Sequence, residues 1–388
     1  MPFPVSISRQ PQSECGFATK MVDHCLSDAI SQSASDIHLQ PRRECWEVYY
    51  RVDGVLHLAK TFPNDSKTNP VARLMSLASL PSYMGGVPQE GSFQWNDENT
   101  QSYEMRLSVF STVHGNRAAI RIMGEDGSVL NLNQLGINQD TETRLKQVCN
   151  AREGWLLVAG PAGSGKTTTL YACLRYIASA EQKRSVLTIE DPVESVIESI
   201  SQCQLQPNSG LNLAAAMRSA VRQDAEVLLV SEIRDAETAE TVLSASMTGH
   251  LCFSSIHAGS IGSTLRRLVQ MKLPTYAIQT GLRGVVCQRL LRRICRQCLD
   301  HPSGKEGCKS CHGTGYKGRV PIFQLVDFNE LESSQQVFTE LENGATATSI
   351  DARIQEVGLA SLEDQATELI DTKITDPAEV FRVLGSRV

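Results

Sequence analysis

The sequence predicts a mixed α/β protein built on a mostly parallel sheet, and three observations support this. First, an apolar run over residues 155–159 is followed by a glycine-rich loop and a helix-competent segment. Second, apolar runs at 186–189, 227–230 and 251–256 are separated by helix-length segments, which is typical of parallel strands joined by helices. Third, alternating apolar and polar residues before residue 124 indicate antiparallel strands of a separate, smaller α+β domain.

Composition and charge narrow the class of protein. A chain of 388 residues is long enough for two or three domains, and its 41% hydrophobic content is typical of a globular protein. The net charge is -6, whereas bulk nucleic-acid binding usually accompanies a basic surplus. No apolar run approaches the roughly 20 residues that span a bilayer, and the N-terminus lacks an export signal. We therefore expect a cytoplasmic protein that binds no nucleic acid directly.

The first third of the chain is expected to form a domain over residues 15–123. Residues 1–14 are polar and proline-rich, which predicts a flexible leader. A helical period follows, and a strand over 46–52 leads through the turn signal Asp53-Gly54 into a returning strand. A second pair of alternating segments meets at a turn further along. Residues 124–140 carry Gly, Ser and Asn with little periodicity and predict a linker.

A phosphate-binding loop lies within the second domain, expected over residues 141–286. Gly160-x4-Gly165-Lys166-Thr167 matches the pattern G-x-x-x-x-G-K-[ST] and stands between a predicted strand and a predicted helix, as that motif requires. In such a loop, backbone N–H groups and the lysine bind phosphates, and the threonine hydroxyl ligates Mg²⁺. The motif therefore predicts a site for a nucleoside triphosphate such as ATP. The residues expected to form it are Gly160, Pro161, Ala162, Gly163, Ser164, Gly165, Lys166, Thr167 and Thr168.

Acidic residues follow two of the other predicted parallel strands. Glu190, Asp191 and Glu194 follow one strand, and Glu232 ends the strand at 227–230 in the Walker B layout. Because ligands of such sheets bind beyond the carboxyl ends of the strands, these side chains are expected to meet at the phosphate loop. Glu232 is expected to activate the attacking water or to hold hydrated Mg²⁺, with Glu190 as the alternative base. Glu194 taken alone is more typical of a solvated surface acid.

Two histidines flank the strand at 251–256. His250 precedes this strand and His257 follows it. A single histidine is usually structural, so a functional role depends on the neighbouring acidic residues. In that setting we expect this pair to sense the nucleotide or to bridge subunits.

Four of the 12 cysteines have the spacing of a metal site, within a module expected at residues 287–325. Cys295-x2-Cys298-x9-Cys308-x2-Cys311 places two C-x-x-C pairs in one short segment. Four thiolates bind Zn²⁺ tetrahedrally and leave no open position, so we expect structural and not catalytic zinc. A redox disulfide pair is the alternative, which a cytoplasmic setting disfavours. The other eight cysteines have no ligand-spaced partner.

Several sequence blocks occur in a fixed order along residues 20–330. The N-terminal blocks are SASDIHLQP, YRVDGVL and MRLSVFSTVHGNRAAIRI, and the later ones are TIEDPVE, SEIRDAETAE and TGHLCFSSIHAGS. Together they resemble the ATPases that drive type II secretion and type IV pilus assembly, whose Asp box, Walker B region and His box match the last three. The tetracysteine segment is similar to that of the assembly ATPases, whereas the retraction ATPases of pili lack it.

This resemblance implies a RecA-like P-loop ATPase core, an N-terminal PAS-like domain and a small zinc-binding insert, assembled as a homo-hexamer. It implies ATP hydrolysis at the cytoplasmic face of the inner membrane. There, a polytopic platform protein would couple it to the pilin-like subunits of a type IV pilus, a type II secretion pseudopilus or a DNA-uptake filament. By the same resemblance, Arg51, Arg106 and Arg121 lie near the phosphates and act as arginine fingers. From the residues alone, a solvated strand face is the simpler interpretation of these arginines.

The chain departs from the family's pattern at several positions. Residues 224–226 are DAE where the family has DPD, and Ser231, Ser255 and Gln324 replace a glycine, a threonine and a glutamate. These changes leave the turnover rate and the role of Gln324 open. The chain also begins almost at the PAS-like domain. We therefore expect that it does not dock through the extra N-terminal domain that assembly ATPases often carry.

The remaining segments allow more than one interpretation. A basic run beside the cysteines predicts a solvated or subunit-contacting helix face, or contact with an acidic loop of the platform protein. It consists of Arg283, Arg289, Arg292, Arg293 and Arg296. Residues 326–388 predict short helices without chemistry of their own. Two other functions stay open: a zinc-containing nucleic-acid motor, which the charge and the sparse aromatic residues disfavour, and a non-hydrolysing ATP-binding regulator.

Overall fold

The computed structural model describes residues 17–64, 69–82, 86–97, 101–123, 130–205, 210–299, 308–356 and 358–385. The predicted leader and the first six residues of the predicted linker lie outside these ranges. The chain divides into two compact units: unit 1 comprises Met1–Gly127 and Ile294–Gly318, and unit 2 comprises Ser128–Arg293 and Arg319–Val388. None of the described helices combines the length and the apolar character that a membrane span needs.

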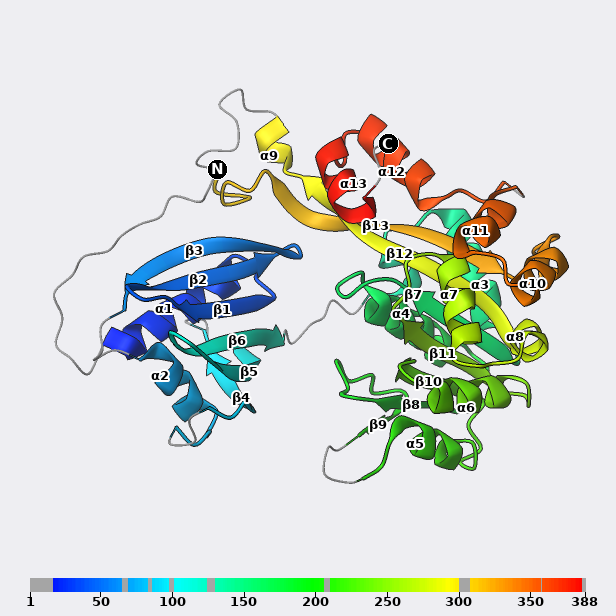
Figure 1. Cartoon of the computed structure of the whole chain (residues 1–388), viewed down its shortest axis with the longest axis horizontal. Coiled ribbons are helices and arrows are strands. Elements are labelled where there is room, and N and C mark those ends of the chain that lie inside the picture. Colours follow the sequence, from blue (N-terminus) through cyan, green and yellow to red (C-terminus); the bar gives the residue numbers. More distant parts are fainter. Residues whose placement is uncertain are drawn as a thin grey trace. The chain divides into compact units, whose positions relative to one another are not determined.

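Unit 1 contains a six-stranded antiparallel sheet with two helices on one face (Figure 1). The strand order is β3-β2-β1-β6-β5-β4. The elements are α1 (Phe17–Ser31), β1 (Asp36–Pro41), β2 (Cys45–Val52), β3 (Val55–Pro63), α2 (Pro70–Leu77), β4 (Gln89–Asn96), β5 (Ser102–Thr112), β6 (Gly115–Met123) and the short α9 (Arg296–Leu299).

Alternation along the strands gives this sheet one apolar face. Trp46, Val48 and Tyr50 of β2 are buried and their neighbours are not, because successive side chains of a strand point to opposite faces. The buried residues pack against α1 and α2. Asp53 and Gly54 both adopt positive φ, at 49° and 81°, as the predicted hairpin turn requires. The predicted first helix and both predicted hairpins are therefore confirmed.

Unit 2 contains a seven-stranded sheet in the order β13-β12-β7-β11-β10-β8-β9 (Figure 1). Its elements before the long strand β12 are η1 (Leu132–Gln134), α3 (Gln139–Cys149), β7 (Gly154–Ala159), α4 (Lys166–Ser179), β8 (Val186–Glu190), β9 (Ser201–Gln204), α5 (Leu213–Ala220), β10 (Val227–Glu232), α6 (Ala236–Ser246), β11 (Leu251–Ile256), α7 (Ile261–Gln270) and α8 (Thr275–Gly281). They are followed by β12 (Leu282–Ile294), β13 (Tyr316–Asp327), α10 (Ser334–Glu342), α11 (Ala347–Gln355), α12 (Leu362–Asp371) and α13 (Pro377–Leu384).

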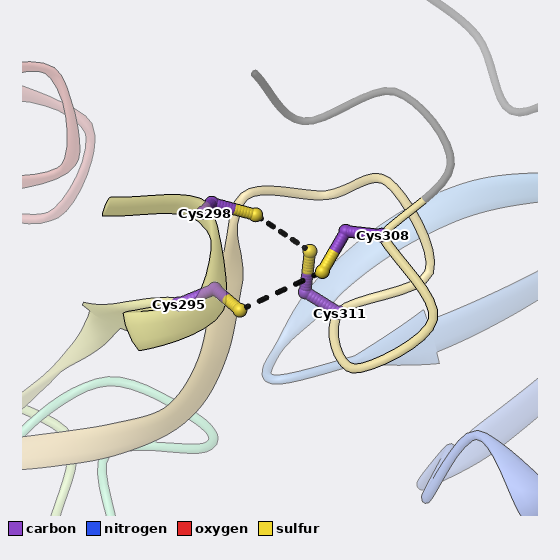
Figure 2. Close-up of side chains that lie close together, drawn as sticks. All are labelled: Cys295, Cys298, Cys308 and Cys311. Atoms are coloured by element: carbon purple, nitrogen blue, oxygen red, sulfur yellow. Dashed lines mark hydrogen bonds between the residues drawn. The ribbon is translucent and has the colours of Figure 1, made fainter. Parts of the chain in front are cut away.

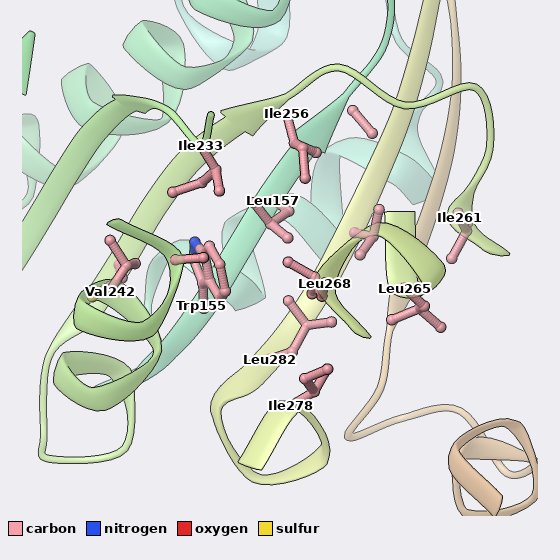
Figure 3. Packing of buried hydrophobic residues seen from close by; sticks show 14 of the residues in the cluster. Trp155, Leu157, Ile233, Val242, Ile256, Ile261, Leu265, Leu268, Ile278 and Leu282 are labelled. Carbon is pink, nitrogen blue, oxygen red and sulfur yellow. The ribbon is translucent and has the colours of Figure 1, made fainter. Parts of the chain in front are cut away.

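The central strands of this sheet are parallel and covered on both faces. β7, β11, β10 and β8 pair in parallel, as the spacing of apolar runs predicts. Trp155 and Leu157 of β7 pack with α6, α7 and α8 on one face (Figure 3), whereas Leu156 and Val158 pack with α3 and α4 on the other. A strand buried on both faces needs apolar residues at every position, which explains the continuous run.

Side-chain caps fix where several helices of unit 2 begin. Asn138, Asn212, Asp235 and Ser260 precede α3, α5, α6 and α7, and each accepts a hydrogen bond from the backbone N–H three residues later. Such a bond satisfies one of the N–H groups that the first helical turn leaves without a partner. The caps of α5, α6 and α7 end loops that follow strands β9, β10 and β11, so they also help to fix the geometry of the sheet's carboxyl edge.

The basic run near the cysteines forms a strand, so the predicted solvated helix face was wrong. Its first four arginines lie on β12, inside the sheet. Arg289 is only 8% exposed, and Arg292 forms an ion pair with Glu379 of α13 at 2.8 Å. The spacing of the arginines imitates a helical period, but their partners come from segments far away in the sequence. The predicted short helices at the C-terminus are confirmed.

Candidate functional site

The predicted phosphate loop joins β7 to α4. Gly165 has a φ of 87°, a left-handed conformation that glycine adopts without strain. A Cβ atom at this position would lie 2.6 Å from Nε2 of Gln288, so a side chain here would displace this buried amide. Lys166 and Thr167 follow in the first turn of α4, at the positive end of the helix dipole. The loop therefore has the backbone geometry of an anion site.

Lys166 is half-buried at the base of this loop. Its Nζ donates hydrogen bonds to the carbonyl oxygens of Gly160 and Pro161, at 3.0 and 2.9 Å. Burial lowers the pKa of Lys166; the charge of Glu232 opposes this change and the charge of Arg289 adds to it. Because neutral carbonyl groups compensate its charge only in part, an anion bound in the loop would be favoured here.

A cavity of ≈ 200 Å³ lies where the loop meets the carboxyl ends of the parallel strands. The predicted residues that line it are Ala162, Lys166, Thr167, Glu190, Asp191, Glu194, Glu232 and His257. Residues from the ends of β8, β10 and β11 therefore surround the start of α4. This arrangement follows from the parallel pairing, which brings the carboxyl ends of these strands to one edge.

Glu232 is held from two sides at the end of β10. His257 Nε2 lies 3.1 Å from its Oε1, and Arg234 Nε lies 2.9 Å from its Oε2. Its side chain stays 19% exposed. A carboxylate has about four lone-pair positions, so one water can still bind to it.

Glu190 is buried and more tightly bound than Glu232. It is 1% exposed and accepts a short hydrogen bond from the hydroxyl of Tyr171. Thr188 Oγ1 and Gln202 Nε2 donate to its other oxygen at 2.6 and 3.1 Å. Since three protein donors use its acceptor positions, Glu190 is better suited to hold the edge of the cavity than to bind a water.

His250 lies at the amino end of β11, at the opposite edge of the sheet from His257. Its Nδ1 lies 3.1 Å from the carbonyl oxygen of Ala245, and its own carbonyl accepts the N–H of Gly154. It does not line the cavity described above. We therefore give His250 no part in the candidate site.

The three arginines named by the resemblance lie side by side in unit 1. The strand registers pair Arg51 with Asp36, Asp36 with Arg121, and Arg121 with Arg106. Asp36 is 3.4 Å from Arg51 Nε and 3.6 Å from Arg121 Nε. Arg106 Nε approaches Glu104 no closer than 3.8 Å, beyond hydrogen-bond range. The row therefore has a local surplus of positive charge.

Arg234 and Tyr171 also line the cavity, and neither had a predicted role. Arg234 follows Glu232 by two positions and turns back onto its carboxylate. Tyr171 lies one helical turn after Thr167 on α4, and its hydroxyl also accepts the backbone N–H of Glu194 at 3.2 Å. The four-residue spacing from Thr167 was a usable signal, because residues i and i+4 share a helix face. Arg234 had no comparable signal.

The four predicted cysteines come together in unit 1, in two facing pairs (Figure 2). All their sulfur atoms lie within 4.8 Å of one another; Cys295 and Cys308 are 3.9 Å apart, and Cys298 and Cys311 are 3.5 Å apart. Four sulfurs bound tetrahedrally to zinc are about 3.8 Å apart, so the cluster fits this metal. Within the cluster, a backbone hydrogen bond from Cys311 lowers the pKa of Cys308 to about 7, whereas burial raises the pKa of Cys298.

A comparison of the whole chain with known protein families shows to which family it belongs. A family model described as "Type II/IV secretion system protein" matches residues 11–382. The chain belongs to this family. The predicted resemblance is thereby confirmed, as is the mixed α/β fold class.

Members of the type II/IV secretion family with known names align with most of the chain. The type IV pilus assembly ATPase PilB of Acinetobacter baylyi is 33% identical over 94% of this chain and 66% of its own length. The type II secretion system ATPase E of Vibrio cholerae is 32% identical over 94% of this chain and 75% of its own length. The solved structure of the Legionella pneumophila ATPase DotB has a TM-score of 0.74 at 20% identity, covering 98% of this chain and 99% of that one.

Proposed function

We propose that this member of the secretion family hydrolyses ATP with Mg²⁺. The observation that supports this most strongly is the cavity in which Lys166 and Thr167 face Glu232 and the acidic residues after β8. Loop N–H groups and Lys166 would bind the phosphates, while Thr167, Asp191 and the bound nucleotide would hold the metal. The names of the relatives, ATPases of pilus assembly and secretion, support the same activity.

Within this site we assign the activation of water to Glu232. Of the two glutamates that end strands β8 and β10, Glu232 keeps partial exposure and free acceptor positions, whereas three protein donors surround buried Glu190. His257 contacts Glu232 and would report the state of the nucleotide to the loop after β11. Glu194 would contribute charge near the metal.

We propose the following domain organisation. Residues 15–123 form a PAS-like domain, 124–140 a linker, 141–286 a RecA-like core, 287–325 a cysteine module and 326–388 a C-terminal helical region. The sheet of unit 1 and the parallel strands β7, β11, β10 and β8 of unit 2 support the first and third of these assignments, and β12 and β13, which flank the cysteines, extend the sheet of unit 2. Arg51, Arg106 and Arg121 of the PAS-like domain would stabilise charge on the transferred phosphate. The four cysteines would bind one structural Zn²⁺.

ATP hydrolysis would power the assembly of a type IV pilus or a type II secretion pseudopilus. We propose a homo-hexamer at the cytoplasmic face of the inner membrane, which acts on a polytopic platform protein and through it on pilin-like subunits. The support is the identity to relatives named for these two processes. Because the chain spans only 66% of the Acinetobacter relative, these partners belong to the proposal alone.

The deciding experiment compares ATP turnover of the wild type with that of Glu232→Gln. We expect kcat to fall at least 100-fold while ATP binding persists, because the amide keeps the shape but cannot accept a proton. Glu226→Gln is the matched control: the same change immediately before the same strand, where Glu226 accepts the N–H of Ser185. If wild type and Glu232→Gln are equally inactive, hydrolysis is excluded and only nucleotide binding remains.

A further inference from the structure

One buried side chain of β12 supports the phosphate loop from behind. Gln288 is 2% exposed. Its Nε2 donates to the carbonyl oxygen of Ser164 at 2.7 Å, and its Oε1 accepts the hydroxyl of Thr169 at 2.8 Å. A single amide thus connects the last part of the loop to the first turn of α4. Removing either bond would leave a buried polar group without a partner.

The bond to Ser164 sets the direction of a phosphate-binding group. In a trans peptide the C=O and the following N–H point in opposite directions. Because the carbonyl of Ser164 points at Gln288, the N–H of Gly165 points away from β12 and into the loop. The carbonyl of Ser164 fixes the orientation of the amide, because a carbonyl oxygen only accepts and therefore requires the Nε2 donor; the hydroxyl of Thr169 then donates to Oε1.

The backbone of Gln288 contacts the other end of the loop. A Cβ atom on Gly160 would lie 2.7 Å from the carbonyl oxygen of Gln288, so only glycine allows this approach. The guanidinium of Arg289 donates to the same carbonyl at 2.8 Å and to the carbonyl of Gly259 at 2.6 Å. Position 288 therefore contacts both ends of the loop and is itself tied to the segment after His257.

We propose that Gln288 is a positioning residue that presets the phosphate loop for nucleotide. It aims the N–H of Gly165 at the phosphate before binding, so that binding does not require the loop to reorganise. This inference rests on the proposed binding of ATP by the loop, but not on hydrolysis or on any filament.

The test is Gln288→Glu, measured by equilibrium binding of a fluorescent ADP to the full chain across pH 6 to 8.5. An ionised carboxylate has no donor for the Ser164 carbonyl, so we expect affinity at pH 8.5 to fall on the order of tenfold. A protonated carboxyl group copies the amide, with one donor and one acceptor, and burial favours this form. Affinity relative to the wild type at the same pH should therefore recover toward pH 6.

Gln365→Glu is the matched control, because Gln365 of α12 makes the same kind of bonds with the backbone of Phe323. It should leave nucleotide affinity unchanged at every pH. If Gln288→Glu does not fold, Thr169→Val carries the test, since it removes the donor that holds Oε1 of the buried amide, and a severalfold weaker affinity is expected. Unchanged affinity in the variant that folds, or a loss without recovery at low pH in Gln288→Glu, overturns the inference. A wild type that binds ADP without hydrolysing ATP would refute only the proposed activity.

Discussion

Glu190 and Glu232 end neighbouring strands of the same sheet but have different surroundings. Three donors from the protein surround Glu190, and Tyr171 supplies the shortest of these bonds. Glu232 contacts the side chains of Arg234 and His257 and remains partly exposed. The chemistry of a carboxylate depends on this environment, so two glutamates at equivalent strand ends can differ in function, one as an anchor and one as a base.

Tyr171→Phe tests the anchoring of Glu190. The change removes one donor to a buried carboxylate and the acceptor for the N–H of Glu194. We expect the free energy of unfolding, measured by urea denaturation, to fall by about 1–3 kcal/mol. ATP turnover should fall severalfold as the edge of the cavity loosens. Tyr176→Phe on the same helix is the control, because the hydroxyl that it removes accepts a 3.3 Å bond from exposed Asn150. Equal effects of both changes would contradict the anchoring role.

At the scale of elements, the local sequence pattern predicted those strands and helices whose buried positions carry apolar residues. β7, β8, β10 and β11 consist mostly of buried apolar residues, and the phosphate loop has a motif of its own. β12 could not be predicted this way. Its polar residues are buried because Gln288 contacts the phosphate loop and Arg292 contacts Glu379, 124 and 87 residues away. Hydrophobic alternation and helical periodicity depend only on residues that are close in the sequence. Contacts with residues far away in the sequence therefore leave no signal in either pattern.

The link between β12 and α13 predicts a pH-dependent contribution to stability. Burial opposes ionisation of Glu379, but hydrogen bonds from Arg382 and Arg292 outweigh it and lower the pKa of Glu379 below its ordinary 4.5. Such a carboxylate stabilises the fold above that pH and loses its contribution as the pH falls through the folded value. We expect Glu379→Gln to reduce the free energy of unfolding at pH 7 by about 3 kcal/mol.

The measurement is urea denaturation of wild type and Glu379→Gln between pH 7 and pH 3. The difference between them should shrink progressively below the ordinary value of about 4.5. Glu356→Gln is the control, since its ion pair with Arg353 is exposed to solvent. A difference that stays constant across this range would contradict the assigned cause.

The cysteine cluster predicts a metal content that can be measured directly. We expect about one zinc per chain by atomic absorption, because four thiolates form a closed tetrahedral site. Cys308→Ser should abolish this zinc and lower the melting temperature, since metal binding contributes to folding. Cys45→Ser, a thiol in the same unit that is not part of the cluster, should retain the metal. Full zinc content in Cys308→Ser would exclude the site.

At the scale of the whole molecule, one unit carries the phosphate loop and the other carries the arginine row. Arg106 and Arg121 are direct cross-strand neighbours, an arrangement that like charges disfavour unless an anion compensates them. Asp36 lies near Arg51 and Arg121, and Glu104 lies 3.8 Å from Arg106, so two carboxylates accompany three arginines. A phosphate group would supply the remainder, with guanidinium groups as strong donors. The row therefore supports the proposal that unit 1 acts on nucleotide held by a phosphate loop.

Mixing two inactive variants tests whether the arginines act on the phosphate loop of their own chain or on that of a neighbouring chain. Arg106→Ala and Lys166→Ala should each lose ATP turnover, on the order of 1,000-fold for removal of an arginine finger. Arg42→Ala, which changes an exposed arginine of the same unit, should retain turnover.

If the arginines act across a hexamer interface, an equal mixture of the two inactive variants forms some sites with an intact loop from one chain and an intact arginine from the other. Random assembly then restores about a quarter of wild-type turnover. A mixture no more active than its components would assign the arginines to their own chain, and full activity of Arg106→Ala would remove them from the mechanism.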